Sequence, residues 1–173
     1  MSVYDQGLDR TDVNWAALTP VGFLERAAGT YPDRIAVIHG RQRFTYARFH
    51  ERCRRLANAL EARGIGEGDT VSVLAPNIPA LLEAHYGVLM AGAVLNAINV
   101  RLDAATVAFV LGHGRSRLLL ADTEFAPLAR DALARLDAPP PVIDIDDPEG
   151  PGGARLGDTE YEVMLDTASP ERP

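Results

Sequence analysis

The stretch that decides the fold reads TVSVLAPNIPALLEAHYGVLMAGAVLNAINVRLDAATVAFVLGHGRSRLLLAD and covers residues 70–122. It contains three short apolar runs that predict strands, at residues 71–75, 94–98 and 118–121. These runs are nearly continuous in apolar residues, which is typical of parallel strands that helices cover on both faces. The segments between them repeat apolar residues at three- and four-residue spacing, so they predict crossover helices. We therefore expect an α/β fold with a mostly parallel sheet that is flanked by helices on both faces.

The crossover helices are expected near residues 78–91 and 103–113, and a further helix near residues 45–63 should cover the same sheet. Gly92 can end the first crossover helix in a left-handed conformation. Asp103 can cap the start of the second.

Right-handed crossovers place the carboxyl ends of these strands at one edge of the sheet, where open α/β sheets bind ligands. Four polar residues should gather at this edge: Asn77, Asn99, Arg101 and Asp122. Asn77 and Asn99 also have a purely structural interpretation, because asparagine is common at helix caps and in turns. The sequence leaves both interpretations open: Asn77 could cap its helix, and Asn99 could bridge loop backbone groups.

Upstream of this stretch, residues 35–39 and 42–44 predict two strands of a small hairpin, next in line to the main sheet. Thr45 follows the hairpin and can cap the helix after it. Downstream, a helix is expected to start near residue 123, and residues 142–145 predict one more strand.

The helix near residues 45–63 carries the single cysteine of the chain, Cys53, on its apolar stripe. We expect a buried thiol there, and a disulfide within the chain is excluded. Arg52, Arg54 and Arg55 lie close together on the same helix. We interpret them as a solvated face, and the alternative interpretation is a phosphate site.

The composition fits a globular domain, since 47% of the 173 residues are hydrophobic and can form a real core. No apolar run reaches the length that spans a bilayer, and the first ten residues are acidic and polar where a signal peptide is basic and then apolar. We therefore expect a cytoplasmic protein without a transmembrane segment.

The net charge of −7 is unevenly distributed, because residues 137–173 hold ten acidic residues and two arginines, a balance of −8 that leaves +1 for the rest. A body without a basic excess argues against a nucleic-acid surface. All 17 basic residues are arginine, and the absence of lysine excludes a Walker-type phosphate loop and Schiff-base chemistry for this chain. The histidines lack the spacing of metal ligands, so no metal site is predicted.

Several motifs also follow one another in a specific order. LAPNIP precedes a helix and is followed by AGAVLNAINVRLDAATVAFVLGHGRSRLLLAD, while Arg43-Phe44-Thr45-Tyr46 and the turn at residues 64–69 lie upstream. This order resembles the N-terminal portion of AMP-forming acyl-CoA synthetases, the fatty-acid–CoA ligases of the adenylate-forming superfamily. The resemblance runs without a gap over roughly residues 15–135.

The resemblance implies a complete enzyme that uses ATP and Mg²⁺ to convert a carboxylic acid into an acyl-adenylate and then passes the acyl group to CoA. It places the nucleotide of CoA near the loop after the second strand and near a following helix, so Asn99, Arg101 and Arg130 are the candidate CoA contacts. The family's phosphate loop, adenine pocket, ribose-binding Asp and catalytic Lys have no counterpart in this sequence. No catalytic residue is assigned, and we do not expect this chain alone to bind ATP, Mg²⁺ or CoA tightly.

We therefore expect three parts: an N-terminal arm (residues 1–18), an α/β subdomain (residues 19–145), and an acidic linker rich in Pro and Gly, or a truncated end (residues 146–173), with at most a short helix near residues 161–165. The expected partner is the missing C-terminal part of the ligase, and exposed apolar surface could drive self-association. The alternative is a stand-alone, non-enzymatic α/β module that binds a small ligand or a partner at the same sheet edge.

Overall fold

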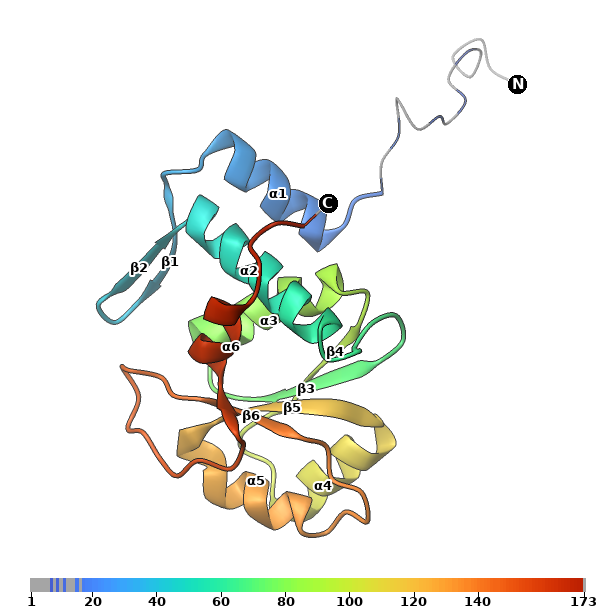
Figure 1. Ribbon diagram of the computed structural model, residues 1–173, viewed down its shortest axis with the longest axis vertical. Helices are drawn as coiled ribbons and strands as arrows, with labels where there is room; N and C mark the ends of the chain where they lie inside the picture. Colours follow the sequence, from blue (N-terminus) through green and yellow to red (C-terminus); the bar gives the residue numbers. More distant parts are fainter. Residues whose placement is uncertain (1–6, 8, 10, 12–14, 16, 173) are drawn as a thin grey trace.

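The structure, a computed structural model, describes residues 7, 9, 11, 15 and 17–172. Most of the predicted arm at residues 1–18 therefore lies outside the described residues. The described chain forms a central sheet between two layers of helices, with a separate hairpin at one end (Figure 1).

The central sheet has five strands in the order β4–β3–β5–β6–β7, and each neighbouring pair is parallel. The strands are β3 (Thr70–Leu74), β4 (Val94–Ala97), β5 (Ser116–Asp122), β6 (Val142–Ile145) and β7 (Thr159–Glu160). The predicted strands within residues 70–122 are thus mutually parallel, as expected, and β6 is the strand predicted at residues 142–145.

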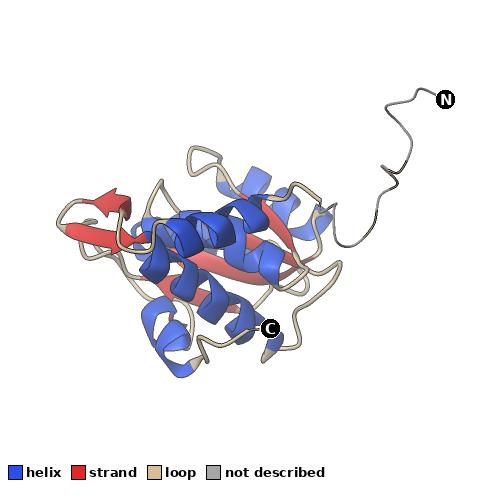
Figure 2. Ribbon diagram, turned by 90° about the horizontal axis from the view of Figure 1, so that it is seen from above, coloured by secondary structure: helices blue, strands red, loops and turns tan. Residues whose placement is uncertain are grey.

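Helices cover both faces of the sheet. One face is covered by α2 (Tyr46–Glu61), α3 (Pro79–Met90) and α6 (Tyr161–Thr167), and the other by α4 (Ala104–His113) and α5 (Ala126–Leu133). Helix α1 (Pro20–Thr30) packs outside the first of these layers, against α2 and α3. Figure 2 shows the helices lying over the strands. The predicted helix near residue 123 begins as a short 3-10 helix, Thr123–Phe125, which leads into α5.

The central strand β5 shows why the apolar runs are continuous. Leu118 and Leu120 belong to the core under α2, α3 and α6, while Leu119 and Ala121 belong to the core under α4 and α5. All four side chains are at most 2% exposed, so both faces of this strand are dry.

The predicted helix caps and the glycine stop after α3 are also confirmed. Thr19, Thr45 and Asp103 each accept a hydrogen bond from a backbone N–H in the first turn of α1, α2 and α4. Gly92 follows α3 with a φ of 74°, which glycine adopts without strain. Cys53 is fully buried, as expected, and burial raises the pKa of its thiol.

The hairpin departs from its prediction. Strands β1 (Ile35–His39) and β2 (Gln42–Thr45) pair antiparallel as a separate two-stranded sheet, not as neighbours of the main sheet. The physical reason is that Val37 and Phe44 find their apolar cover on α1 and α2, against the cluster that contains Phe49 and Cys53.

The C-terminal region is also more ordered than expected. The short helix expected near residues 161–165 is present as α6, and the unexpected feature is the strand β7 at residues 159–160, which joins the central sheet. Tyr161, Met164 and Leu165 are each 1% exposed and complete the core under α2 and α3. The acidic, Pro- and Gly-rich composition concealed these three apolar anchors.

A buried ionic network joins these helices, and it corrects the interpretation of Arg52 as part of a solvated face. Arg52 is 5% exposed, and its Nε and Nη2 donate to the two carboxylate oxygens of Glu83 on α3 at 2.5 and 3.2 Å. Its Nη1 and Nη2 also donate to Glu162 on α6, at 2.7 and 2.6 Å. The Tyr161 hydroxyl donates to Glu83 at 2.8 Å, and the guanidinium lies over the Phe44 ring, 5.1 Å from its centroid.

The pKa values of Arg52 and Tyr161 keep both side chains protonated, as hydrogen-bond donation to the carboxylates requires. Burial lowers the pKa of Arg52, but hydrogen bonds to Glu162 and Glu83 outweigh it and hold that pKa above its ordinary value. Burial and the neighbouring Glu83 raise the pKa of Tyr161, so its hydroxyl stays protonated and can donate. The network therefore contains a charged guanidinium at all ordinary pH values.

We predict that Arg52→Ala destabilises the fold by about 3–5 kcal/mol, because it leaves the fully buried Glu83 without its cation. The control is Arg48→Ala on the same helix, which breaks an exposed pair with Glu51 and should cost less than about 1 kcal/mol. Urea unfolding gives both values. Equal, small losses in the two variants would contradict the central role of Arg52.

Candidate ligand-binding edge of the sheet

The strand order defines a switch point at the carboxyl edge of the sheet. From β3 the chain passes through α3 to β4 on one side and then through α4 to β5 on the other side of β3. Open α/β sheets bind ligands in the crevice at such a reversal. Asn77 lies in the loop after β3, and Asp122 is the last residue of β5, so the sequence placed both residues at this edge correctly.

Asn77 does not cap α3, which rules out one structural interpretation of this residue. The N-cap position is occupied by Ile78, which makes no side-chain cap hydrogen bond, and Pro79 begins the helix. The Asn77 side chain is exposed, and within the described part of the chain it makes no hydrogen bond. Its amide is therefore available to a ligand.

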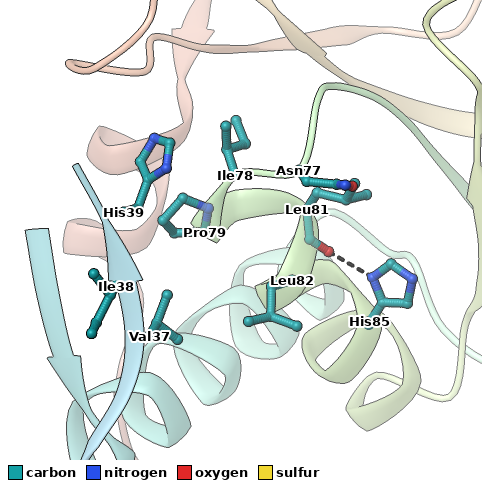
Figure 3. Close-up of a pocket in the computed structure, with 9 residues that line it drawn as sticks. All are labelled: Val37, Ile38, His39, Asn77, Ile78, Pro79, Leu81, Leu82 and His85. Carbon is teal, nitrogen blue, oxygen red and sulfur yellow. Dashed lines mark hydrogen bonds between the residues drawn. The ribbon is translucent and has the colours of Figure 1, made fainter.

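Asn77 lies at the rim of a pocket of about 300 Å³ between the hairpin and the start of α3 (Figure 3). The lining residues are Val37, Ile38, His39, Asn77, Ile78, Pro79, Leu81, Leu82 and His85. Most of these side chains are apolar, and the two histidines and the Asn77 amide supply the polar groups. Such a pocket suits the apolar portion of a small ligand.

Both histidines of the pocket are held in place. His39 is hydrogen-bonded through Nε2 to Asp147, at 2.8 Å, which ties the hairpin to the loop after β6. His85 donates from Nδ1 to the carbonyl oxygen of Leu81 at 2.8 Å (Figure 3). The sequence offered no expectation of this pocket, because β1 and α3 are brought together only by tertiary packing.

Asp122 is a structural residue of this edge. It is 3% exposed, and its carboxylate accepts a hydrogen bond from the Glu124 N–H at 2.9 Å, which caps the 3-10 helix. Burial raises its pKa, and nearby carboxylates, Asp147 foremost, add to this. Asp122 therefore shapes the loop from beneath the surface.

The loop after β6 is held to the sheet by Asp144. This residue is 1% exposed, and its carboxylate accepts hydrogen bonds from the N–H groups of Leu156 and Gly157, both at 3.0 Å. A Cβ at Gly153 would lie 1.9 Å from the carbonyl oxygen of Thr123, so the loop can approach the sheet edge this closely only because glycine stands there.

The three candidate CoA contacts lie in two places. Asn99 and Arg101 lie together in the loop after β4, where the Asn99 side chain accepts a hydrogen bond from the Arg101 N–H at 2.9 Å. Asn99 thus bridges loop backbone, as its structural interpretation predicts. Arg130 lies on the exposed side of α5. In the part of the chain that the structure describes, the guanidinium groups of Arg101 and Arg130 make no hydrogen bond or ion pair, so both are available to anions.

Two negative findings apply to the described residues. They contain no group of three or more His, Cys, Asp or Glu side chains that could hold a metal ion. Within the same residues, no helix has the length and apolar character needed to cross a membrane.

The chain matches a family model described as "AMP-binding enzyme" over residues 24–172. It is 46% identical over 178 residues to the acetate/butyrate–CoA ligase AAE7 of Arabidopsis thaliana, covering 96% of this chain and 31% of the relative. It is 43% identical to the acetate–CoA ligase CCL3 of Humulus lupulus, covering 95% of this chain and again 31% of the relative. The chain therefore spans less than a third of the length of these relatives.

Solved structures show the same fold. The N-terminal domain of FACL13 from Mycobacterium tuberculosis is 28% identical with a TM-score of 0.73, over 90% of this chain and 38% of that one. The anthranilate–CoA ligase AuaEII, solved with anthranoyl-AMP, has a TM-score of 0.80 over 88% of this chain and 28% of that one, at 20% identity.

We predict that Asp122→Asn stabilises the protein at neutral pH, since asparagine can still accept the Glu124 N–H without burying a charge. The folded-state pKa of Asp122 is raised, so the wild type regains stability as pH falls through that pKa, and the difference from the variant should shrink in acid.

The control is Asp103→Asn. Hydrogen bonds from Thr106 lower the pKa of Asp103, so this carboxylate adds stability at neutral pH that is lost as pH falls through its folded pKa. Thermal unfolding of both variants from neutral to acidic pH should give differences of opposite sign. A difference for Asp122→Asn that grows in acid would contradict the buried-charge argument.

Proposed function

Because the chain belongs to the AMP-binding enzyme family, we propose that it forms the N-terminal part of an ATP-dependent ligase that joins a carboxylic acid to CoA. The observation that carries this proposal is the 46% identity to an acetate/butyrate–CoA ligase over 96% of the chain. The fold supports it, since solved CoA ligases contain the same arrangement of strands and helices.

The proposed reaction has two steps. A carboxylate oxygen of the acid attacks the α-phosphorus of ATP, which forms the acyl-adenylate and releases pyrophosphate. The CoA thiolate then attacks the acyl carbonyl carbon, and AMP leaves. ATP, Mg²⁺ and CoA are the proposed cofactors and substrates of the complete enzyme, and the partner of this chain is the rest of that enzyme.

We propose only the chemical class of the acid substrate, a carboxylic acid, and not one particular acid. Fatty acids are the first class to test, and the relatives are named for acetate, butyrate, benzoate and trans-cinnamate. A panel from acetate to long-chain and aromatic acids therefore covers the proposal. A cytoplasmic location is part of the same proposal.

Within this enzyme we propose a supporting role for the present chain. An adenylating site needs clustered hydrogen-bond donors and positive charge around the triphosphate, to neutralise the departing pyrophosphate. This chain lacks lysine, so we assign those triphosphate-binding groups to the remainder of the ligase. Arg101 and Arg130 are exposed and unpaired within the described residues, and we assign them to the phosphates of CoA. Exposed apolar side chains, such as Ile38 at 66% and Phe109 at 67%, are proposed to contact the remainder or a second copy of the chain.

We predict that a chimera in which this chain replaces the matching segment of the Arabidopsis thaliana acetate/butyrate ligase forms acyl-CoA from ATP, CoA and an acid. The control chimera carries the corresponding segment of the Humulus lupulus acetate ligase, which tests the junctions. This chain alone serves as the negative control, and it should support no ATP–pyrophosphate exchange. A folded but inactive chimera beside an active control would favour the stand-alone, non-enzymatic module.

In that chimera, we predict that Arg101→Ala and Arg130→Ala each weaken the use of CoA by roughly tenfold, through the lost charge-assisted hydrogen bonds. ATP–pyrophosphate exchange should stay unchanged, because CoA enters only in the second step. Arg135→Ala, which removes an exposed arginine just beyond α5, is the matched control. Parallel losses in exchange and in thioester formation would show that the two arginines are structural.

A further inference from the structure

The outward side of α3 carries no charged residue. The helix reads PALLEAHYGVLM, and its single charged residue, Glu83, is fully buried in the network with Arg52. The residues that α3 exposes are Leu82, His85 and Leu89, which lie on one side of the helix because they follow one another at three- and four-residue spacing. A helix that stays at a protein surface normally has charged and polar residues on that side. The composition of α3 is therefore that of a helix with cover on both sides.

Other helices of the described chain provide the contrast. Helix α5 exposes Arg130 and Asp131, and α6 exposes Glu162 and Asp166, as expected of faces that water covers. Helix α4, on the opposite face of the sheet, resembles α3 instead, since it has no carboxylate or arginine and exposes Phe109. The apolar outward side of α3 is thus not a general property of the helices in this chain.

The hairpin extends this apolar side of α3. Ile38 of β1 is 66% exposed, and Leu82 and Leu89 are 39% and 40% exposed. Ile38 and Leu82 line the pocket of Figure 3 together, so the hairpin and α3 present one continuous surface. We call it the α3 face, and its members are Ile38, Leu82, His85 and Leu89. An exposed apolar surface with a hollow in it is typical of an interaction site.

The length of the relatives indicates what covers this face. The chain spans 31% of the acetate/butyrate ligase of Arabidopsis thaliana, so the larger part of that enzyme lies outside the matched segment. A second copy of this chain is a poorer candidate, because a stable dimer buries about 800 Å² on each partner, more than four side chains can offer. A covalently linked segment needs no such area, since the linkage itself gives a high effective concentration.

We propose that the α3 face is the surface on which the remainder of the ligase docks, with an apolar side chain of that remainder in the pocket of Figure 3. This inference rests on the proposed function. Asn77 lies at the rim of the same pocket and at the carboxyl edge of the sheet, so the docked remainder lies beside that edge. The contact thereby brings the triphosphate-binding groups of the remainder to the edge that carries Asn99 and Arg101.

Hydroxyl-radical footprinting read by mass spectrometry tests the proposal on unsubstituted side chains. It compares this chain alone with the chimera that contains it in place of the matching segment of the Arabidopsis thaliana ligase. Labelling of Ile38, Leu82 and Leu89 should fall severalfold in the chimera, because the remainder covers them. Val163 on α6, which is 55% exposed beside the charged Glu162, is the control and should be labelled equally in both proteins.

Leu89→Glu provides a second test, with Val163→Glu as its matched control. In this chain alone the new carboxylate reaches water in both variants, so the two should lower Tm by similar, small amounts. In the chimera, Leu89→Glu places a carboxylate without a partner in the contact, which is costly. Its Tm should then fall by several degrees more than that of Val163→Glu.

Equal labelling of the α3 face in the chain alone and in the chimera would overturn the docking proposal, even if the chimera is active. Equal Tm losses for the two variants in the chimera would do the same. Labelling of the chain alone that falls as its concentration rises would assign the face to a second copy and also overturn the proposal. A protected face in an inactive chimera would support docking and contradict only the proposed ligase activity.

Discussion

The buried guanidinium of Arg52 is the interaction on which the packing of one helix layer depends. It joins α2 to Glu83 on α3 and to Glu162 on α6, while Tyr161 gives Glu83 a further donor. A seven-residue helix such as α6 has little stability by itself, so it needs tertiary contacts. A buried ion pair is weak evidence of net stability, but loss of one member leaves an unpaired charge in the core. The network therefore specifies this arrangement of helices more than it strengthens it.

The same arrangement sets the geometry of the ligand-binding edge. Once α6 is held, β7 pairs beside β6, and the loop between them returns over the sheet edge through the hydrogen bonds of Asp144. That loop in turn carries Asp147 and Glu149, which bind His39 and Arg41 of the hairpin. The hairpin forms one wall of the apolar pocket and α3 forms the other. A chain of polar contacts thus connects the core network to the pocket at the carboxyl edge.

The two groups of free arginines differ in their surroundings. Arg101 and Arg130 are exposed, so their interactions with anions should be screened by salt. Arg54 is half-buried, with its Nε fully covered, and lies on the helix layer that α1 covers.

The sequence alone determined strands β3 to β6 of the central sheet, because strands that helices cover on both faces must be apolar throughout, and that pattern is local. It also determined the helix starts at Thr19, Thr45 and Asp103, since a cap needs only a side chain and the next turn of backbone. The placement of Asn77 and Asp122 at one edge followed from the handedness of crossovers. The burial of Arg52 also has a local signal, because Arg52 lies three residues after Phe49 and four before Leu56, on the apolar stripe of α2.

Only the tertiary structure decided what those stripes and edges contact. The burial of Arg52 required Glu83 and Glu162, which lie 31 and 110 residues further along the chain. The hairpin left the main sheet because its apolar face found cover on α1 and α2, and α6 joined the core although its surroundings are acidic and rich in Pro and Gly. The pocket at the carboxyl edge of the sheet also arises between elements that are distant in sequence, β1 and α3. Local patterns specify which groups must be buried or bonded, but the partner that satisfies each group is chosen only when the whole chain packs.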